Sequence, residues 1–425
     1  MSAITPSNYE HLTIDKNGKR VDLSTKTIGF NYYESLLSPT VTANMVVVDT
    51  GSVPIPVGKE QNVQGKSGSV LSSLPITGNE RLEFKIATKY GKLDFQLSPL
   101  YVDGAPGFVR DGNKESYGIA LVSKASLDNE RVSLKRKYTG KISDNVEKIL
   151  LNELKIPKNK LIIDSTVHNY NFLGNDKDPF FVILNLASKS VPYPSNNKSG
   201  DPGFFFYETR SGMNFRSISN LIKQQPKATY RQTSVLRDDD PNADYKILSF
   251  SQSKNQSVIN ALRSGTFSSK NIFFDPRTFK YKEVEVSLRN KELTSYLGKK
   301  PDITAEFDTS NRTHFHILDI GCLDNDVSIK TNNNPELWQA ESTTRYNLLF
   351  TQVINIVVPC NVSLMAGDII ECYLQNTTTS NKNGSPWDEQ MSGKYLIMNL
   401  CHSFDTTRSY TSLTLVRDTY GLYSK

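Results

Sequence analysis

Three stretches near the end of the chain decide its fold: AGDII at 366–370, GKYLI at 393–397 and YTSLTLVRD at 410–418. Each is short, and turn residues separate them. The second stretch continues through Cys401 and Phe404, and the third alternates apolar and polar side chains. Alternation at every second position indicates a strand with one buried face. The three stretches therefore predict strands at the edge of a β-barrel or β-sandwich.

The beginning of the chain carries a similar pattern. Short apolar runs are separated by Asp-Lys-Asn-Gly at 15–18 and by Ser38-Pro39, which are hairpin signals. The run 45–48 is apolar at every position and predicts a strand buried on both faces. A loop rich in Gly, Ser and Pro spans 51–73, and a new strand is expected at 82–87. This region predicts a small β-barrel.

The middle of the chain changes to mixed helix and strand. Ser143 is the expected N-cap of a helix with apolar residues at helical spacing over 146–154. Further helices are expected at 180–190 and 214–223. The aromatic segment 203–209 is expected to be a core strand, because it lacks the interleaved basic residues of a base-stacking surface. This part predicts an α/β insert.

The region after residue 230 predicts a short helix at 255–264, with three apolar side chains facing inward. These are Val258, Ile259 and Leu262. Residues 290–341 are polar and rich in Asn, and they predict an elaborated insertion or a long surface arm. Strands are expected at 271–274 and 278–287, and a β-rich stretch at 348–350 and 353–359.

Two short motifs resemble ligand sites but lack parts of them. Gly65-Lys66-Ser67 ends like a phosphate-binding loop, but Glu60 stands where a glycine is needed and no helix-forming sequence follows. Asp238-Asp239-Asp240 lacks the alternate spacing and the closing Glu of a calcium loop, so a solvated turn is favoured and weak ion binding stays open. We expect neither a nucleotide nor a calcium site.

Histidines and cysteines give no metal site either. His314 and His316 would share one face of a strand, but a closed zinc site needs four ligands. The chain has 5 histidines in all, and the other three, His11, His168 and His402, lie in unrelated segments. The 4 cysteines have no short paired spacing, which favours buried thiols in a reducing compartment. We therefore predict no metal and no cofactor.

Catalytic motifs are missing from the sequence. There is no Gly-x-Ser-x-Gly elbow, no His-Glu-x-x-His pair and no dinucleotide fingerprint. Two carboxylates for glycoside cleavage could still meet in the fold, and the sequence leaves that open. We predict no catalytic, cofactor-binding or metal-binding residues, and no enzyme activity.

Composition sets the outer limits. A chain of 425 residues exceeds one ordinary core, and a net charge of +6 provides no basic stripe for tight nucleic-acid binding. No signal peptide is visible, and no run approaches the roughly 18 apolar residues that span a bilayer. We expect assembly in a cytoplasm and no membrane insertion.

Four blocks, taken in order, resemble the central hub protein of contractile phage tail baseplates. They are FNYYESLLSPTVTANMVVVDTGS from 30 with LPITGNERLEF from 74, YGIALVSKASLDNERVSLKRKYTGKISDNVEKIL from 117, GFFFYETRSGMNFRSISNLI from 203, and the closing strands ending in TLVRD. Late-control protein D and the hub part of type VI secretion spike proteins share the closing pattern. The resemblance is weak between 289 and 341.

This resemblance implies an α+β, mainly β fold with two tube-like β-barrel domains, an α/β insert and a polar elaboration. The implied domains are residues 1–115 for the first barrel, 116–230 for the insert, and 231–425 for the second barrel. An insertion at about 290–345 interrupts the second barrel.

For function, the resemblance implies a homotrimeric, pseudo-six-fold ring in the tail baseplate of the virion. The ring would adapt the six-fold tail tube to the three-fold spike and surround the channel for DNA ejection. The implied partners are the trimeric spike protein, the tail tube protein and the baseplate wedge proteins, and the tape-measure protein is a further candidate. Phage DNA would pass without specific binding.

Two alternatives stay open at this point. A receptor- or carbohydrate-binding tail module would also be β-rich and free of catalytic motifs. The hub of a phage-derived secretion or injection machine would share the same barrels.

Overall fold

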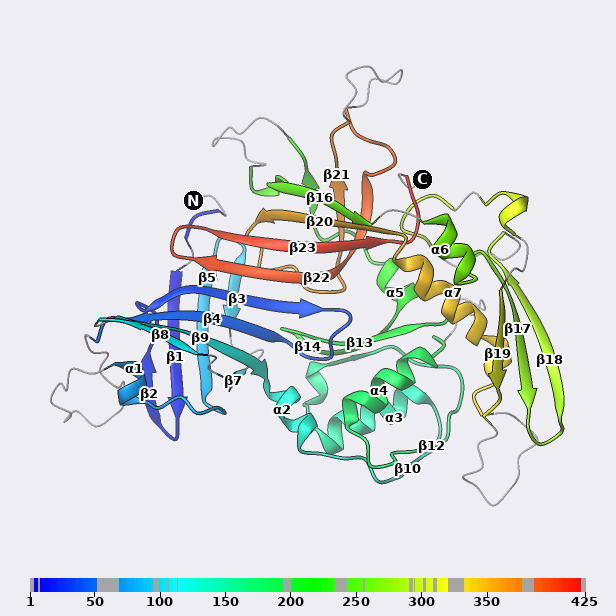
Figure 1. The fold of residues 1–425 in the computed structure, drawn as a ribbon, viewed down its shortest axis with the longest axis horizontal. Helices are drawn as coiled ribbons and strands as arrows, with labels where there is room; N and C mark the ends of the chain where they lie inside the picture. Colours follow the sequence, from blue (N-terminus) through cyan, green and yellow to red (C-terminus); the bar gives the residue numbers. More distant parts are fainter. Residues whose placement is uncertain are drawn as a thin grey trace.

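The computed structural model describes residues 4–6, 8–51, 69–94, 99–104, 107–112, 114–193, 200–233, 243–254, 257–289, 293, 295–300, 303–308, 312–319, 332–376 and 386–421. The fold is α+β and mainly β, as predicted. Figure 1 shows the β regions from the two ends of the chain lying against each other, with the helices of the insert below them and a small sheet projecting at one edge. The motifs at 65–67 and 238–240 lie outside the described residues.

The N-terminal region consists of short antiparallel strands around one core. The predicted hairpin at 15–18 is confirmed, with Asn17 and Gly18 both at positive φ between paired strands. Apolar side chains from these strands, among them Phe30, Met45 and Phe84, are fully buried. The elements are β1 (Asn8–Lys16), β2 (Lys19–Asp22), β3 (Thr27–Ser35), β4 (Thr42–Asp49), α1 (Val70–Ser73), β5 (Arg81–Thr88), β6 (Gly91–Asp94), β7 (Leu100–Gly104), β8 (Phe108–Asp111) and β9 (Lys114–Ser123).

The prediction that 45–48 is buried on both faces is wrong. Met45 and Val47 are buried, but Val46 is 38% exposed. The strand lies between β3 and β9 with one face on the core and the other open, which is the usual state of an antiparallel sheet.

The insert packs helices on a three-stranded sheet of order β11–β14–β13. The aromatic strand is confirmed as core, because all six residues of β13 are buried. The predicted helix at 180–190 is confirmed as α4. The elements are α2 (Lys124–Glu130), β10 (Lys137–Tyr138), α3 (Ile142–Lys148), the π-helix Ile149–Glu153, β11 (Leu161–Ile163), β12 (Phe172–Leu173), α4 (Pro179–Ser188), β13 (Phe204–Thr209), β14 (Gly212–Ser217) and α5 (Ile218–Ile222).

Two helix boundaries in the insert differ from prediction. Ser143 lies inside α3 instead of capping it, and its hydroxyl accepts a hydrogen bond from the Thr166 backbone at 3.3 Å. The segment 214–223 divides between strand and helix. Ser217 caps α5, so the residues before it stay free to pair with β13.

The C-terminal region contains a second set of strands and the projecting sheet of β17, β18 and β19. The predicted strands at 271–274 and 278–287 are confirmed as β17 and β18. The elements are β15 (Thr229–Arg231), β16 (Ser249–Lys254), α6 (Val258–Arg263), β17 (Ser268–Asp275), β18 (Lys280–Ser287), β19 (Thr313–Ile317), α7 (Gln339–Leu349), β20 (Gln352–Pro359), β21 (Ile369–Tyr373), β22 (Gly393–Asp405) and β23 (Ser409–Arg417).

One detail of the predicted helix at 255–264 and one strand prediction differ from the structure here. The helix α6 is present, but its three apolar side chains do not all face inward. Leu262 packs against a buried cluster as predicted, whereas Val258 is 38% exposed beside a cavity and Ile259 is 63% exposed. Leu348 and Leu349 end the helix α7 instead of opening a strand, and β20 begins only at Gln352. Both leucines are buried, as they would also be in a strand, and a short apolar run does not by itself distinguish a helix from a strand.

The two β regions form one continuous sheet. Its order is β16–β20–β23–β22–β3–β4–β9–β7–β5–β1–β2, so the pair β22–β3 joins the end of the chain to its beginning. The division into domains at 115 and 230 stays a prediction. Within the described residues, no helix combines the length and apolar character needed to cross a bilayer.

The sheet repeats one topology. We call β3, β4, β5, β7 and β9 the first β unit, and β16, β20, β21, β22 and β23 the second β unit. Numbered along the chain within each unit, the strands pair in the order first, second, fifth, fourth, third, and every pair is antiparallel. The register repeats too, with a bulge after Val102 in β7 and after Ile397 in β22. The chain therefore contains an internal structural duplication.

Candidate functional site

The two neighbouring histidines of the sequence lie on β19, and His316 is bonded within the protein. His316 Nε2 lies 3.0 Å from Asn271 Oδ1, and its Nδ1 lies 3.2 Å from Gln339 Nε2, so both ring nitrogens have protein partners. Burial is the main cause that lowers the pKa of His316. Among the described residues, no group of three or more His, Cys, Asp or Glu could hold a metal ion.

The described cysteines are free thiols. Cys360 and Cys372 are buried and Cys401 is half-buried. Burial raises the pKa of Cys360 to about 12 and that of Cys401 to about 11, so both stay protonated near neutral pH. Cys322 lies outside the described residues.

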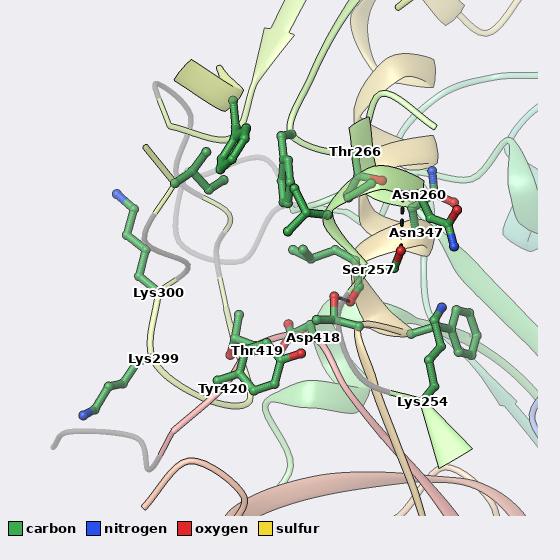
Figure 2. A pocket seen from close by; sticks show the side chains of 18 of the residues that line it. Lys254, Ser257, Asn260, Thr266, Lys299, Lys300, Asn347, Asp418, Thr419 and Tyr420 are labelled. Carbon is green, nitrogen blue, oxygen red and sulfur yellow. Dashed lines mark hydrogen bonds between the residues drawn. The ribbon is translucent and has the colours of Figure 1, made fainter. Parts of the chain in front are cut away.

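A cavity of about 760 Å³ lies beside α6, the end of α7 and the exit of β23. Figure 2 shows lysines and hydroxyl groups at its rim. The Ser257 hydroxyl accepts the Asn260 backbone N–H at 3.4 Å and so caps α6. The Asp418 carboxylate pairs with Arg345. The described lining of the cavity thus offers apolar contacts and charges of both signs, Lys299 and Glu389 among them, and it contains no histidine or cysteine.

The junction between the two β units is the pairing of β3 with β22. Seven consecutive residue pairs form it, and serine hydroxyl groups add side-chain hydrogen bonds between the two strands. Ser35 Oγ donates to Asn399 Oδ1 at 2.6 Å, and Ser403 Oγ donates to Asn31 Oδ1 at 2.6 Å. The junction therefore fixes the relative position of the two units by backbone and side-chain bonds together.

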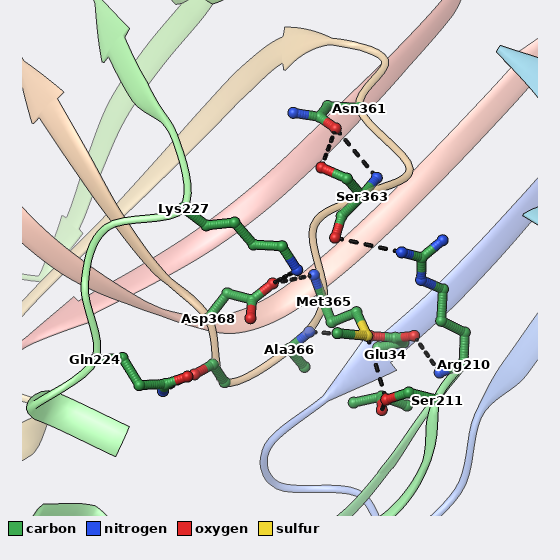
Figure 3. A network of polar contacts seen from close by, with 12 residues as sticks. Glu34, Arg210, Ser211, Gln224, Lys227, Asn361, Ser363, Met365, Ala366 and Asp368 are labelled. Carbon is green, nitrogen blue, oxygen red and sulfur yellow. Dashed lines mark hydrogen bonds and ion pairs between the residues drawn. The ribbon is translucent and has the colours of Figure 1, made fainter. Parts of the chain in front are cut away.

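Glu34, at the end of β3, joins all three parts of the molecule (Figure 3). Its carboxylate accepts the Arg210 backbone N–H from the insert at 2.7 Å and the Ala366 backbone N–H from the second β unit at 2.9 Å. It also accepts the Tyr32 hydroxyl at 3.1 Å. Burial raises the pKa of Glu34 to about 7, although these donors act in the opposite direction.

A second buried carboxyl lies close by. Glu208 of β13 accepts the Val41 backbone N–H at 2.9 Å, which ties the insert to the start of β4. Burial raises its pKa to about 7, and the Glu34 charge adds to this. Two carboxyls thus hold the insert against the first β unit, and each bonds a backbone donor that would otherwise be unpaired.

The Gly367-Asp368 turn that stood out in the sequence is the place where the insert meets the second β unit. Gln224 Nε2 donates to the Gly367 carbonyl at 2.8 Å. Gly367 has φ +87°, and an added Cβ would overlap the Tyr207 hydroxyl. Only glycine satisfies both the backbone angle and the close approach. Figure 3 shows the neighbouring Asp368 facing Lys227.

The first β unit contains the same corner at Asn79-Glu80. The Asn79 N–H donates to the Val102 carbonyl at 2.7 Å, and the Gly367 N–H donates to the Ile397 carbonyl at 2.9 Å. Asn79 also has positive φ, at +67°. The backbone of the two corners is therefore equivalent bond by bond.

The carboxylates of the two corners are equivalent as well. Glu80 accepts the Thr77 backbone N–H at 2.9 Å and pairs with Lys16 at 2.7 Å. Asp368 accepts the backbone N–H three residues before it at 2.8 Å and pairs with Lys227 at 2.8 Å. The duplication thus extends from strand order to side-chain chemistry.

The neighbouring residues Arg417 and Asp418 at the end of the last strand are both buried, and each bonds another part of the chain. Arg417 lies over the Tyr395 ring at 4.5 Å and donates from Nε to Gln352 Oε1 at 3.1 Å. Asp418 forms an ion pair with Arg345 at 3.1 Å, and neither side chain is exposed. This ion pair fastens α7 to the end of β23.

Several strands of the continuous sheet pair on one side only among the described residues, and β8 and β16 are two of them. β8 pairs there only with β9, and β16 pairs only with β20. All four residues of β8 are exposed, with Phe108 at 56% and Val109 at 70%. Five of the six residues of β16 are exposed. Open edges of this kind are sites where another chain can add a strand.

The projecting sheet carries an apolar outer face. Register places Tyr281 and Ile317 on either side of Phe274, and Phe315 beside Ile272, all on one face. The exposed fractions are 68% for Tyr281, 78% for Phe315 and 80% for Ile317. A contiguous apolar face of this size is typical of protein contact surfaces. Sequence reasoning treated 290–345 only as polar and missed this face, although Phe315 and Ile317 alternate at strand spacing.

No protein-family model and no curated protein match this chain. Solved structures do match it. The tail protein from Neisseria meningitidis MC58 is 10% identical, with 96% of each chain covered and a TM-score of 0.50. The prophage MuSo2 43 kDa tail protein from Shewanella oneidensis is 10% identical, with 96% of this chain and 100% of that chain covered and a TM-score of 0.51. The chain therefore has the fold of these tail proteins.

Proposed function

We propose that this chain is the central baseplate hub of a contractile phage tail, a homotrimeric ring with pseudo-six-fold inner symmetry. The ring joins the six-fold tail tube to the three-fold spike. The role is structural, without enzyme activity, and is carried out in the tail baseplate of the virion after assembly in the host cytoplasm.

One observation carries this proposal, namely the internal duplication. The two β units repeat strand order, register and the carboxylate corner, and they meet edge to edge at the β3–β22 junction. Three copies of a chain with two such units supply six quasi-equivalent units. Closed rings need surfaces that match from one unit to the next, and the junction already shows one such match within the chain.

The partners follow from this geometry. The six β units would face the hexameric tail tube protein on one side of the ring. The three inserts would break six-fold symmetry toward a trimeric spike, with the tape-measure protein as a further neighbour. DNA would pass through the ring without specific binding, so tight, salt-sensitive DNA binding by the pure protein would contradict this part.

The β17–β19 face is the proposed contact for peripheral wedge proteins. It belongs to a segment between β16 and β20 that has no counterpart between β3 and β4. Three copies would therefore present three apolar faces. Replacing Phe315 by Asp should remove wedge protein from assembled baseplates and leave the ring intact, and retention of the wedge would contradict the assignment.

The test of the ring is its copy number. Native mass spectrometry or electron microscopy of the hub, alone at high concentration and in tail particles, should show three chains per ring. One, two or six copies would overturn the proposal. Clearing of a peptidoglycan suspension by the pure protein would overturn the non-enzymatic role.

A further inference from the structure

The junction within the chain has a property that a ring requires. β22 uses its first half to pair with β21 and its second half, from Asn399 to Asp405, to pair with β3. β22 thus belongs to one β unit and also pairs with the first strand of the other. If the same step is repeated between copies, the first β unit must offer an equivalent of this second half, and the second β unit must offer an equivalent of β3.

The equivalent of the second half of β22 is β8. In the second unit, His402 pairs with Thr411 and Ser403 pairs with Tyr410. In the first unit, Phe108 pairs with Tyr117 and Val109 pairs with Ser116. Tyr117 and Thr411 stand at the same distance before the matching residues Leu121 and Leu415, which face the bulges of β7 and β22. In the first unit, β7 and β8 together therefore occupy the positions beside β9 that β22 alone occupies beside β23 in the second unit.

The equivalent of β3 is β16. Phe30 pairs with Met45 of β4, and Phe250 pairs with Ile356 of β20. Met45 and Ile356 in turn face Ile119 and Leu413, which are matching positions of β9 and β23. Asn31 therefore corresponds to Ser251, and Tyr32 corresponds to Gln252.

Both equivalents are open where the junction is closed. The second half of β22 is largely covered, with His402 fully buried and Phe404 at 1% exposure, whereas Phe108 and Val109 of β8 are more than half exposed. β3 has a partner on each side, whereas β16 has one on β20 alone among the described residues. Among the described residues, β8 and β16 thus lack the second partner strand that β22 and β3 provide for each other.

We propose that β8 of one copy pairs with β16 of the next copy, antiparallel, and repeats the β22–β3 junction between chains. The register follows residue by residue: Asp111 opposite Ser249, Arg110 opposite Phe250, Val109 opposite Ser251 and Phe108 opposite Gln252. This pairing rests on the proposed function, because it names the contact that closes the ring.

The chemistry of the two edges fits this contact. Two exposed apolar side chains of β8 would be covered, and the backbone groups of both edges would gain partners. The surfaces are different on the two sides of the contact, so the arrangement is head to tail and closes into a ring only when the rotation allows it. Within one chain, the β3–β22 junction leads from one β unit to the next. A ring of six β units has six such junctions, three within chains and three between chains, so it needs three chains.

Disulfide capture tests the register. Val109→Cys with Ser251→Cys, and separately Phe108→Cys with Gln252→Cys, should form intermolecular disulfides under mild oxidation of the concentrated full chain. Successive residue pairs in an antiparallel ladder alternate between hydrogen-bonded and non-hydrogen-bonded pairs. One of the two designs therefore has the closer Cα spacing of a non-hydrogen-bonded pair. The largest product on a non-reducing gel should be a covalent trimer.

The matched control shifts the register by one residue. Val109→Cys with Gln252→Cys places the two thiols on opposite faces and should yield no more product than each single variant, which also accounts for the native thiols. In addition, Val109→Asp should raise the concentration for half-association at least about tenfold, equal to about 1.4 kcal/mol. Phe279→Asp, at an exposed apolar position outside the contact, should leave it unchanged.

The outcomes separate this inference from the proposed function. Trimers by native mass without cross-links in either design would overturn the strand assignment and leave the hub proposal standing. Cross-linking of the control pair as strong as that of the designed pairs would also overturn it. Copy numbers other than three in tail particles would overturn the hub proposal itself.

Discussion

The two β units share a backbone but are held by different neighbours. At the corner of the first unit, Glu80 pairs with Lys16 from β1, the strand that pairs with β5 of this unit. At the corner of the second unit, Asp368 pairs with Lys227 from the segment after the insert, and Tyr207 of the insert lies against Gly367. The difference shows that one backbone corner can be held by different neighbours, a strand of the same β region in the first unit and the insert in the second.

The largest expected effect concerns the residue that follows the last strand of each unit. Asp418 is buried and paired with Arg345, whereas its counterpart Lys124 has 61% of its side chain exposed. Arg345→Leu should lower the free energy of unfolding by about 3–5 kcal/mol, because it leaves a buried carboxyl without its partner. Lys124→Leu should change it by less than about 0.5 kcal/mol. Urea unfolding followed by tryptophan fluorescence measures both, and equal effects would remove this contrast.

The next effect compares the two corners directly. Gly367→Ala should cost about 2–4 kcal/mol, since positive φ and the overlap with Tyr207 both act against a side chain. Asn79→Ala has the backbone term alone and should cost about 1–2 kcal/mol. Thermal unfolding by circular dichroism gives both values. A Gly367 variant as stable as the Asn79 variant would show that the insert does not press on the corner.

The carboxyls at the junction predict a pH dependence that the first corner does not share. Glu34 and Glu208 have pKa values raised to about 7, mainly by burial. Between pH 4.5 and 7 the folded state therefore binds more protons than the unfolded state, and the free energy of unfolding should fall as pH rises, by up to about 3 kcal/mol per carboxyl. Glu34→Gln should flatten this slope.

Glu80 provides the contrast. Burial would raise its pKa, but the hydrogen bonds from Lys16 and from backbone N–H groups outweigh burial and lower it. Its contribution is present above the ordinary carboxyl pKa and is lost as pH falls below it. Stability measured from pH 3 to pH 8 should therefore peak near pH 4–5, and a curve that rises steadily to pH 8 would contradict the assignment.

The smallest effect concerns the two lysines. Lys16 and Lys227 have 30% and 34% of their side chains exposed, so each ion pair should contribute about 1 kcal/mol or less. Lys227→Met should weaken the attachment of the insert and increase its proteolysis, whereas Lys16→Met should not. Limited proteolysis with mass spectrometry separates the two, and identical cleavage patterns would count against different roles for the corners.

Local pattern determined much of this protein. The alternation in the closing strands, the Asn-Gly turn at 17–18 and the burial of the aromatic strand 204–209 follow from side-chain period and turn chemistry. These signals depend on neighbours in the chain, so they can be read without the fold. The likeness to tail proteins was also expected from ordered motifs, and it is confirmed at the level of the fold.

Tertiary structure decided the rest, because it depends on residues far apart in the chain. Ser143 bonds Thr166 instead of capping a helix, and Val46 faces outward because its sheet has one open side. The pairing of β3 with β22 joins residues more than 360 positions apart, and no local period reports it. The duplication is invisible in the sequence because Asn79 and Gly367, or Glu80 and Asp368, match in backbone position and hydrogen bonding while their residue types differ.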